Sequence, residues 1–186
     1  GPAYLQLATG YALLPDYRGA DLEESNRLAL ETVDRGIEVD PNIEVAAGAV
    51  YGFVYHKQKR WEKAEEAYQR AINARVVDSN AFNWYSRMLA SVGRLDASVE
   101  EALKAQRIGP DSAIVNSRLA IAYAWIGDAT NAAEFFERSR YLGVGGSTHL
   151  LANALFLTRI GQFESARQLT TAGVRMQGAN SDWIDP

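Results

Sequence analysis

The feature that most constrains the fold of this chain is a repeat with a period of 34 residues. Units that begin at residues 45, 79, 113 and 147 follow one another without an insertion. In all four units the eighth, twentieth and twenty-seventh positions hold Gly, Ala or Ser, namely Gly52, Ser86, Ala120, Ala154, Ala64, Ser98, Ala132, Ala166, Ala71, Ala105, Ser139 and Gly173. Two helices approach closely only where their side chains are small, and a stacked copy of the pair has the same requirement. The period therefore predicts a stack of helical pairs.

The fifteenth position of each unit predicts the turn between the two helices of a pair. Gly93, Gly127 and Gly161 occupy it in three units, and Lys59 occupies it in the other. Glycine is favoured after a helix because the backbone there often needs a positive φ. We therefore expect a short turn at this position.

These columns, with Tyr or Leu at the eleventh position and Pro110 at the thirty-second, resemble the tetratricopeptide repeat (TPR) family. The resemblance covers residues 45–178. It departs from the family where Val76, Val144 and Gly178 replace proline, and the family's tryptophan at the fourth position is absent. The resemblance implies an all-α fold, a right-handed superhelical solenoid of antiparallel helix pairs.

An irregular helical pair is expected upstream of the repeats. Residues 21–38 have the pattern of an amphipathic helix, residues 3–14 would form its partner, and residues 15–19 would form a loop. We therefore predict about five helix pairs. The predicted organisation is an irregular first pair at 1–44, repeats at 45–78, 79–112, 113–146 and 147–180, and a tail at 181–186. The predicted helices lie near 3–14, 21–38, 43–58, 61–75, 79–92, 95–108, 112–126, 129–141, 147–160 and 163–177.

Composition limits the class of protein and its partners. The 186 residues are 47% hydrophobic and 23% charged, which is typical of a globular chain. The formal net charge of −4 argues against nucleic acid as a partner, because phosphate binding needs clustered positive charge. Cysteine is absent, which excludes disulfides and is compatible with the cytoplasm or the periplasm. No apolar run reaches the roughly 18 residues of a membrane span, and Gly1-Pro2 resembles the remnant of a removed purification tag, so we expect part of a longer protein.

Signatures of catalysis, of a cofactor and of a metal site are weak. His56 and His149 stand in different units, and neither has a second ligand one helical turn away. Residues 143–148 are rich in glycine but lack the lysine of a phosphate-binding loop, so we interpret them as a turn followed by a helix cap. We predict that the chain is not an enzyme and holds no cofactor or metal.

The family resemblance implies that the first helix of each pair lines a concave groove. The expected first helices, 45–58, 79–92, 113–126 and 147–160, contain no Asp or Glu in a chain that is acidic overall. Either a partner prefers a non-acidic groove, or these helices are more buried; the sequence leaves both open. The columns that the family directs into the groove give the partner-binding candidates Phe53, His56, Asn80, Asn83, Trp84, Arg87, Ser117, Arg118, Trp125 and Arg159, with Lys57 beside them.

Aromatic and arginine side chains are common anchors of protein interfaces. Asn83 and Arg87 lie one helical turn apart, where they could jointly hold a carboxylate. Trp84 and Trp125 either contact a partner or pack between units.

Two functions follow as hypotheses. The first is a scaffold whose groove binds a peptide or helical segment of a protein that is neutral to acidic. The alternative is a sensor or regulatory segment that controls an attached effector domain, because the irregular start also resembles TPR regions of bacterial signalling proteins.

The C-terminal end is expected to leave apolar surface open, because each pair in a solenoid presents an apolar side to its neighbour. This surface would include Leu155, Phe163 and Leu169. We expect Trp183 and Ile184 to cover it, or else self-association through this end.

Overall fold

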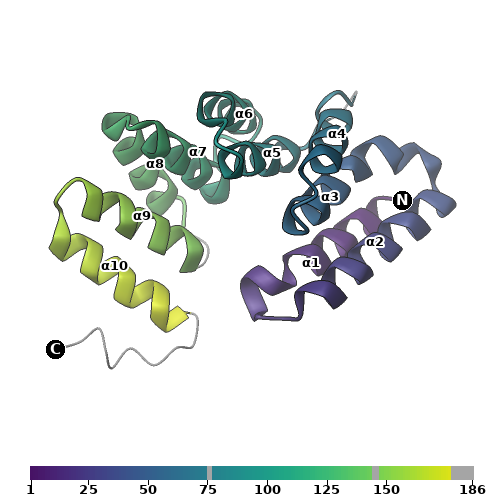
Figure 1. The fold of residues 1–186 in the computed structure, drawn as a ribbon, viewed down its shortest axis with the longest axis horizontal. Coiled ribbons are helices and arrows are strands. Elements are labelled where there is room, and N and C mark those ends of the chain that lie inside the picture. Colours follow the sequence, from purple (N-terminus) through teal and green to yellow (C-terminus); the bar gives the residue numbers. More distant parts are fainter. Residues whose placement is uncertain (75–76, 144–146, 177–186) are drawn as a thin grey trace. The chain divides into compact units, whose positions relative to one another are not determined.

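The computed structural model describes residues 1–74, 77–143 and 147–176, and every regular element in these ranges is helical (Figure 1). The elements are α1 (Pro2–Arg18), α2 (Leu22–Val39), the 3-10 helix η1 (Pro41–Ile43), α3 (Glu44–Lys57), α4 (Trp61–Ile72), α5 (Ser79–Ser91), α6 (Leu95–Ile108), α7 (Ala113–Ile126), α8 (Ala129–Tyr141), α9 (Ser147–Arg159) and α10 (Phe163–Met176). Each predicted helix is present, and its ends lie within four residues of the expected ones. The all-α prediction is confirmed.

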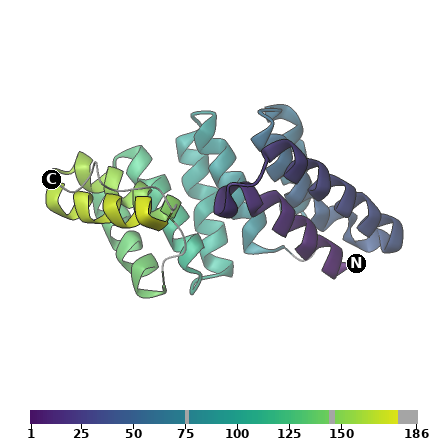
Figure 2. The ribbon, with the colours of Figure 1, turned by 90° about the horizontal axis from the view of Figure 1, so that it is seen from below.

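The chain divides into two compact units, residues 1–93 and 94–186. In the first unit α1 packs on α2 and α3 packs on α4, while α5 contacts α3 and α4. In the second unit α7 packs on α8 and α9 on α10, while α6 contacts α7. Figures 1 and 2 show these pairs as hairpins of adjacent helices. The division at Gly93 falls inside the predicted repeat 79–112, so α5 and α6 belong to different units.

The first helix is longer than the sequence suggests, and the predicted loop at 15–19 is wrong. α1 continues through Pro15 to Arg18 and ends at Gly19, whose φ is 62°. A proline inside a helix removes one backbone hydrogen bond and costs about 3 kcal/mol, so other contacts must hold the last turn. Asp16 supplies them, because its carboxylate bonds to Lys57 of α3 and Arg87 of α5.

The small residues of the repeat lie where helices approach closely, as predicted. In the first unit a Cβ on Gly52 would come within 2.7 Å of the ring of Tyr68. Gly48 stands outside the three repeated columns but is as close to a neighbour, since its Cβ would lie 2.6 Å from the carbonyl oxygen of Ala67. In the second unit Ala132 has no exposed surface and packs in a cluster with Ala120, Phe136 and Phe156. Overpacking at any of these positions requires the helices to move apart.

The turns at the fifteenth position all need a left-handed residue. Gly93, Gly127 and Gly161 have φ values of 79°, 86° and 80°. Lys59 has a φ of 59° and is the one non-glycine residue with a positive φ in the described part of the chain. The predicted turn is confirmed, including the unit in which the sequence lacks glycine.

Several expectations lie outside the described residues. They concern Val76, Val144 and Gly178, which replace the proline of the family pattern, and Trp183 and Ile184, which are expected to cover the apolar surface at the C-terminal end. Among the helices that the structure does describe, none combines the length and the apolar character needed to cross a membrane.

Candidate partner-binding site

On the first unit, the face formed by α1, α3 and α5 carries two cations that share one carboxylate. The ammonium of Lys57 donates to Oδ1 of Asp16, and Nη1 of Arg87 lies 3.3 Å from Oδ2 of the same residue. The three side chains are partly buried, with exposed fractions of 15% for Lys57, 34% for Arg87 and 24% for Asp16. The cluster is therefore partly open to solvent, and its two cations are paired with a carboxylate of the chain itself.

One aromatic ring lies beneath these cations, and a second ring packs against the first. The Nζ of Lys57 is 5.4 Å and the guanidinium carbon of Arg87 is 5.9 Å from the centroid of the Phe53 ring. The Phe53 ring in turn packs on Trp84, with 4.8 Å between centroids. Phe53 has no exposed surface and Trp84 is buried. Phe53 therefore supports the cations through cation–π contacts, and Trp84 supports Phe53 by packing against it. The accessible groups of this cluster are the charged ones.

The other candidates in the first unit are buried or stand at the start of a helix. The imidazole of His56 is buried, lies 3.3 Å from the hydroxyl of Ser91 and packs on the ring of Trp61. Asn83 is buried, and Asn80 stands at the start of α5, where its backbone N–H donates to Asp78. Arg87 bonds to Asp16 of the same chain, and a partner carboxylate held jointly by Asn83 and Arg87 stays a prediction.

The second unit brings Ser117 of α7 next to His149 of α9. The Ser117 hydroxyl is 2.7 Å from Nδ1 of His149. Ser117 is 1% exposed. Its hydroxyl therefore connects α7 to α9 through His149 and is not part of the surface. Arg118, the next residue of α7, is partly exposed.

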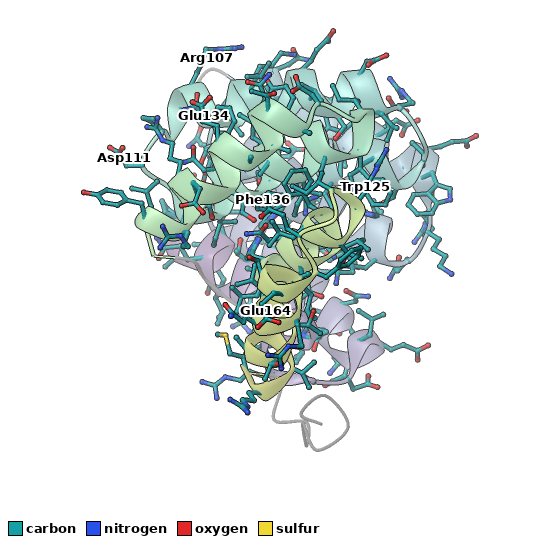
Figure 3. The ribbon with its side chains drawn as sticks, turned by 90° about the vertical axis from the view of Figure 1, so that its left-hand side faces the viewer. Arg107, Asp111, Trp125, Glu134, Phe136 and Glu164 are labelled. Atoms are coloured by element: carbon teal, nitrogen blue, oxygen red, sulfur yellow. The ribbon has the colours of Figure 1, made fainter. Side chains whose placement is uncertain are left out.

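Trp125 and Arg159 lie at a pocket of about 360 Å³ between α7, α8 and α9. Trp125 is 53% exposed, and Nη1 of Arg159 donates to the carbonyl of Ala124 at 3.2 Å. This bond fixes the arginine beside the pocket, whose other lining is mostly apolar. Figure 3 labels Trp125 and Phe136, which come from α7 and α8. The full lining is Ile121, Ala124, Trp125, Phe136, Ala152, Leu155, Phe156, Thr158 and Arg159.

Most of this pocket could have been read from the repeat. Ile121, Ala124, Ala152, Leu155 and Thr158 occupy the same groove columns as the predicted candidates, although none of them is an aromatic or charged anchor. Phe136 and Phe156 lie outside those columns, so only the structure places them at the pocket. The pocket is therefore lined by two of the predicted candidates, Trp125 and Arg159, together with residues that are not among the candidates.

The fold defines the class: the chain has the fold of tetratricopeptide-repeat proteins. No family model matches it. It is 14% identical to TTC0263, a TPR protein of Thermus thermophilus, with a TM-score of 0.76 over 97% of this chain and 93% of that one. It is also similar to the Pseudomonas aeruginosa protein PilF (22% identity, TM-score 0.70, 97% of this chain and 78% of that one) and to the type IV pilus biogenesis factor PilW (21%, 0.72, 96% and 78%).

One curated protein is similar in sequence. It is anaphase-promoting complex subunit 3 of Schizosaccharomyces pombe, 24% identical over 118 residues, or 63% of this chain. The match spans 18% of that protein's length.

Proposed function

We propose that the chain is a protein-interaction scaffold that anchors an extended or helical segment of a partner in the α7–α8–α9 pocket. The observation that supports this most is the pocket itself, with the exposed ring of Trp125 and the fixed guanidinium of Arg159 at its lining. An apolar cavity of about 360 Å³ accommodates one or two side chains. Tryptophan and arginine are the residue types that most often dominate binding energy at interfaces.

The charges of the first helices favour a partner that is neutral to acidic. Arg159 lines the pocket, and Lys57 and Arg87 already hold a carboxylate on the first unit. The repeat range 45–58 leaves out Glu44, but Glu44 is the first residue of α3, so this first helix does carry one acidic residue. Glu44 lies at the helix N-terminus, away from the Lys57 end.

We infer that the Ser117–His149 pair is structural and that the chain is not an enzyme. A serine nucleophile must reach its substrate, whereas Ser117 is 1% exposed. The comparisons agree with an interaction role: YrrB, which is 15% identical with a TM-score of 0.60, is a TPR protein with an unusual peptide-binding site. They give no support to the regulatory alternative.

A peptide titration tests the proposal. The probe is a blocked five-residue peptide with Leu and Phe followed by Glu, titrated into the isotope-labelled chain and followed by amide chemical shifts. We expect shifts in α7 and α9, and at least tenfold weaker binding to Trp125→Ala, since hot-spot truncations cost about 2 kcal/mol or more. Replacing Glu of the probe by Lys should weaken binding to the wild-type chain but not to Arg159→Gln.

Equal affinity of the wild-type chain and Trp125→Ala for the probe would remove the pocket from the proposal. A matched control is Tyr141→Ala on α8, whose side chain is exposed and does not line the pocket.

A further inference from the structure

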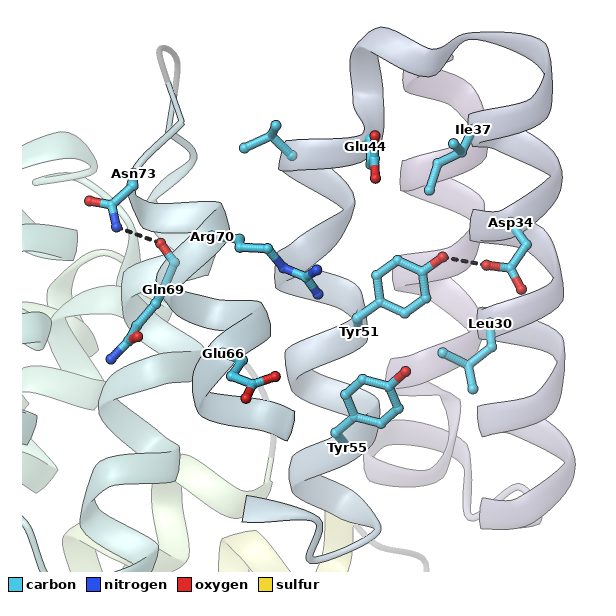
Figure 4. A pocket seen from close by; sticks show the side chains of 11 residues that line it. Leu30, Asp34, Ile37, Glu44, Tyr51, Tyr55, Glu66, Gln69, Arg70 and Asn73 are labelled. Carbon is cyan, nitrogen blue, oxygen red and sulfur yellow. Dashed lines mark hydrogen bonds between the residues drawn. The ribbon is translucent and has the colours of Figure 1, made fainter. Parts of the chain in front are cut away.

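A second and larger pocket lies on the first unit, where α2 and α4 flank α3 (Figure 4). Its volume is about 1110 Å³, more than a typical small-molecule site of roughly 300–1,000 Å³. None of the partner-binding candidates lines it. The lining residues are Leu30, Asp34, Ile37, Glu44, Val45, Tyr51, Tyr55, Glu66, Gln69, Arg70 and Asn73.

The charge of this pocket is opposite to that of the α1–α3–α5 face. Asp34, Glu44 and Glu66 contribute three carboxylates against the single guanidinium of Arg70. Within the described residues no ion pair joins Glu44, Glu66 or Arg70 to another side chain. The carboxylates therefore leave an uncompensated negative potential in a concave site, which concentrates cations.

Two tyrosines form the aromatic part of the pocket. The rings of Tyr51 and Tyr55 are stacked, with 6.2 Å between centroids. The Tyr51 hydroxyl donates to Asp34, which fixes both groups on the pocket wall. Burial, followed by this hydrogen bond, raises the pKa of Tyr51 above its ordinary value, so the phenol stays protonated and adds no charge. The Tyr55 ring already contacts one guanidinium of the chain, because the guanidinium carbon of Arg60 lies 4.8 Å from its centroid. Arg60 does not line the pocket.

We propose that this pocket binds an arginine-bearing segment of a partner protein, at a site separate from the α7–α8–α9 pocket. A guanidinium can stack on a tyrosine ring while it donates to a carboxylate, which suits arginine better than lysine. The volume accommodates several peptide residues. Arg70 points toward Tyr51 in Figure 4, and the three carboxylates exceed what one arginine neutralises.

Amide chemical shifts during titration with a blocked six-residue peptide containing two arginines test the proposal. The control probe is the same peptide with citrulline, which keeps the shape but not the charge of arginine. We expect shifts at Tyr51, Glu66 and Arg70, and at least tenfold weaker binding of the citrulline peptide. Affinity should also fall between 0.05 and about 0.5 M salt, because exposed charges are screened.

Charge variants distinguish binding at the pocket from attraction of the peptide by the overall negative charge of the chain. Asp34→Asn with Glu66→Gln should weaken binding about three- to thirtyfold, from two exposed charge contacts. Glu38→Gln with Glu62→Gln makes the same charge change on exposed positions of α2 and α4 outside the pocket, and should alter affinity less than twofold. Tyr55→Leu should weaken binding about two- to fivefold through the lost cation–π contact, and the fold should accept it because Leu89 and Leu157 occupy the same repeat position.

Three outcomes would overturn the proposal. They are equal affinity for the arginine and citrulline peptides, shifts confined to residues outside α2–α4, and an equal loss of affinity in the pocket and control charge variants. If a variant fails to fold, the chemical-shift titrations of the wild-type chain with the arginine and citrulline peptides still test the proposal. None of these results bears on the Trp125 pocket, whose probe is acidic and whose variants lie in the other unit.

Discussion

Asp16 sets the electrostatics of the α1–α3–α5 face at the scale of single residues. Its carboxylate bonds to Lys57 and Arg87, 41 and 71 residues away in the sequence. A partner carboxylate that approaches these cations must compete with it. Binding of a partner carboxylate to Lys57 and Arg87 therefore includes the free-energy cost of breaking their contacts with Asp16.

Arg87→Glu is expected to abolish binding of an acidic partner recovered with the wild-type chain, while the far-ultraviolet circular dichroism stays unchanged. The new carboxylate would face Asp16 and repel both it and the partner. Loss of the partly exposed Arg87–Asp16 pair should cost about 1 kcal/mol of stability. Arg107→Glu, an equal charge change at an exposed position of α6, is the control. Undiminished binding by Arg87→Glu would exclude this face for that partner.

Lys59→Gly is expected to stabilise the first unit. Lys59 holds a φ of 59°, a region that costs roughly 1–2 kcal/mol for a residue with a Cβ, and Lys59 is exposed. Part of this gain is lost because glycine has more conformational freedom in the unfolded chain, so a net gain of about 0.5–1 kcal/mol is expected. Urea denaturation measures it, with Gln58→Gly as the control that should destabilise. A lower midpoint for Lys59→Gly would mean that its side chain makes a stabilising contact.

Close helix packing is decided at the scale of elements, and here the sequence was most informative. Small residues such as Gly52 and Ala132 and the glycine turns follow directly from the repeat, because one geometry recurs every 34 residues. The contact of Asp16 with Lys57 does not recur and depends on α1 continuing past Pro15, which local propensity opposes. The pocket between α2 and α4 was not predicted either, because it depends on side chains from three helices and its Asp34 lies upstream of the repeats.

Ala132→Leu is expected to destabilise the second unit by about 1–3 kcal/mol, since extra methylenes in a packed core force helices apart. Ala132 is fully buried against Ala120, Phe136 and Phe156. Ala133→Leu, one residue further along α8 and exposed, is the matched control and should leave the thermal midpoint within a degree or two. Hydrogen exchange should accelerate in α7–α10. An unchanged midpoint for Ala132→Leu would contradict the close approach of α7 and α8.

At the scale of the whole molecule, the two compact units carry different surfaces. The first unit has the cation cluster on α1, α3 and α5 and the acidic pocket at α2–α4. The second unit has the apolar pocket and, on α9 and α10, two strongly exposed apolar side chains. Leu155 is 64% and Phe163 is 68% exposed, as expected for this end, whereas Leu169 is partly buried.

Self-association through α9 and α10 is the expected consequence of these exposed side chains. Large apolar groups on the outer face of a helical pair in a solenoid are normally covered by a neighbour, and Leu155 also lines the α7–α8–α9 pocket. Light scattering should therefore show a mass that rises with concentration for the wild-type chain and stays at the 20.5 kDa of one chain for Leu155→Ser with Phe163→Ser. Tyr141→Ser removes an equally large group that is 87% exposed on α8 and should associate like the wild-type chain.

The shared role of Leu155 links association to peptide binding. If a second copy covers Leu155, then saturating the pocket with the Leu-Phe-Glu probe should lower the mass toward one chain, because the two ligands compete for one surface. Phe163→Ser alone should weaken association without changing peptide affinity, since Phe163 does not line the pocket. A wild-type chain that stays monomeric at millimolar concentration would show that Leu155 and Phe163 do not form an association surface. An oligomer whose mass does not change when the probe is added would show that the association surface does not include Leu155.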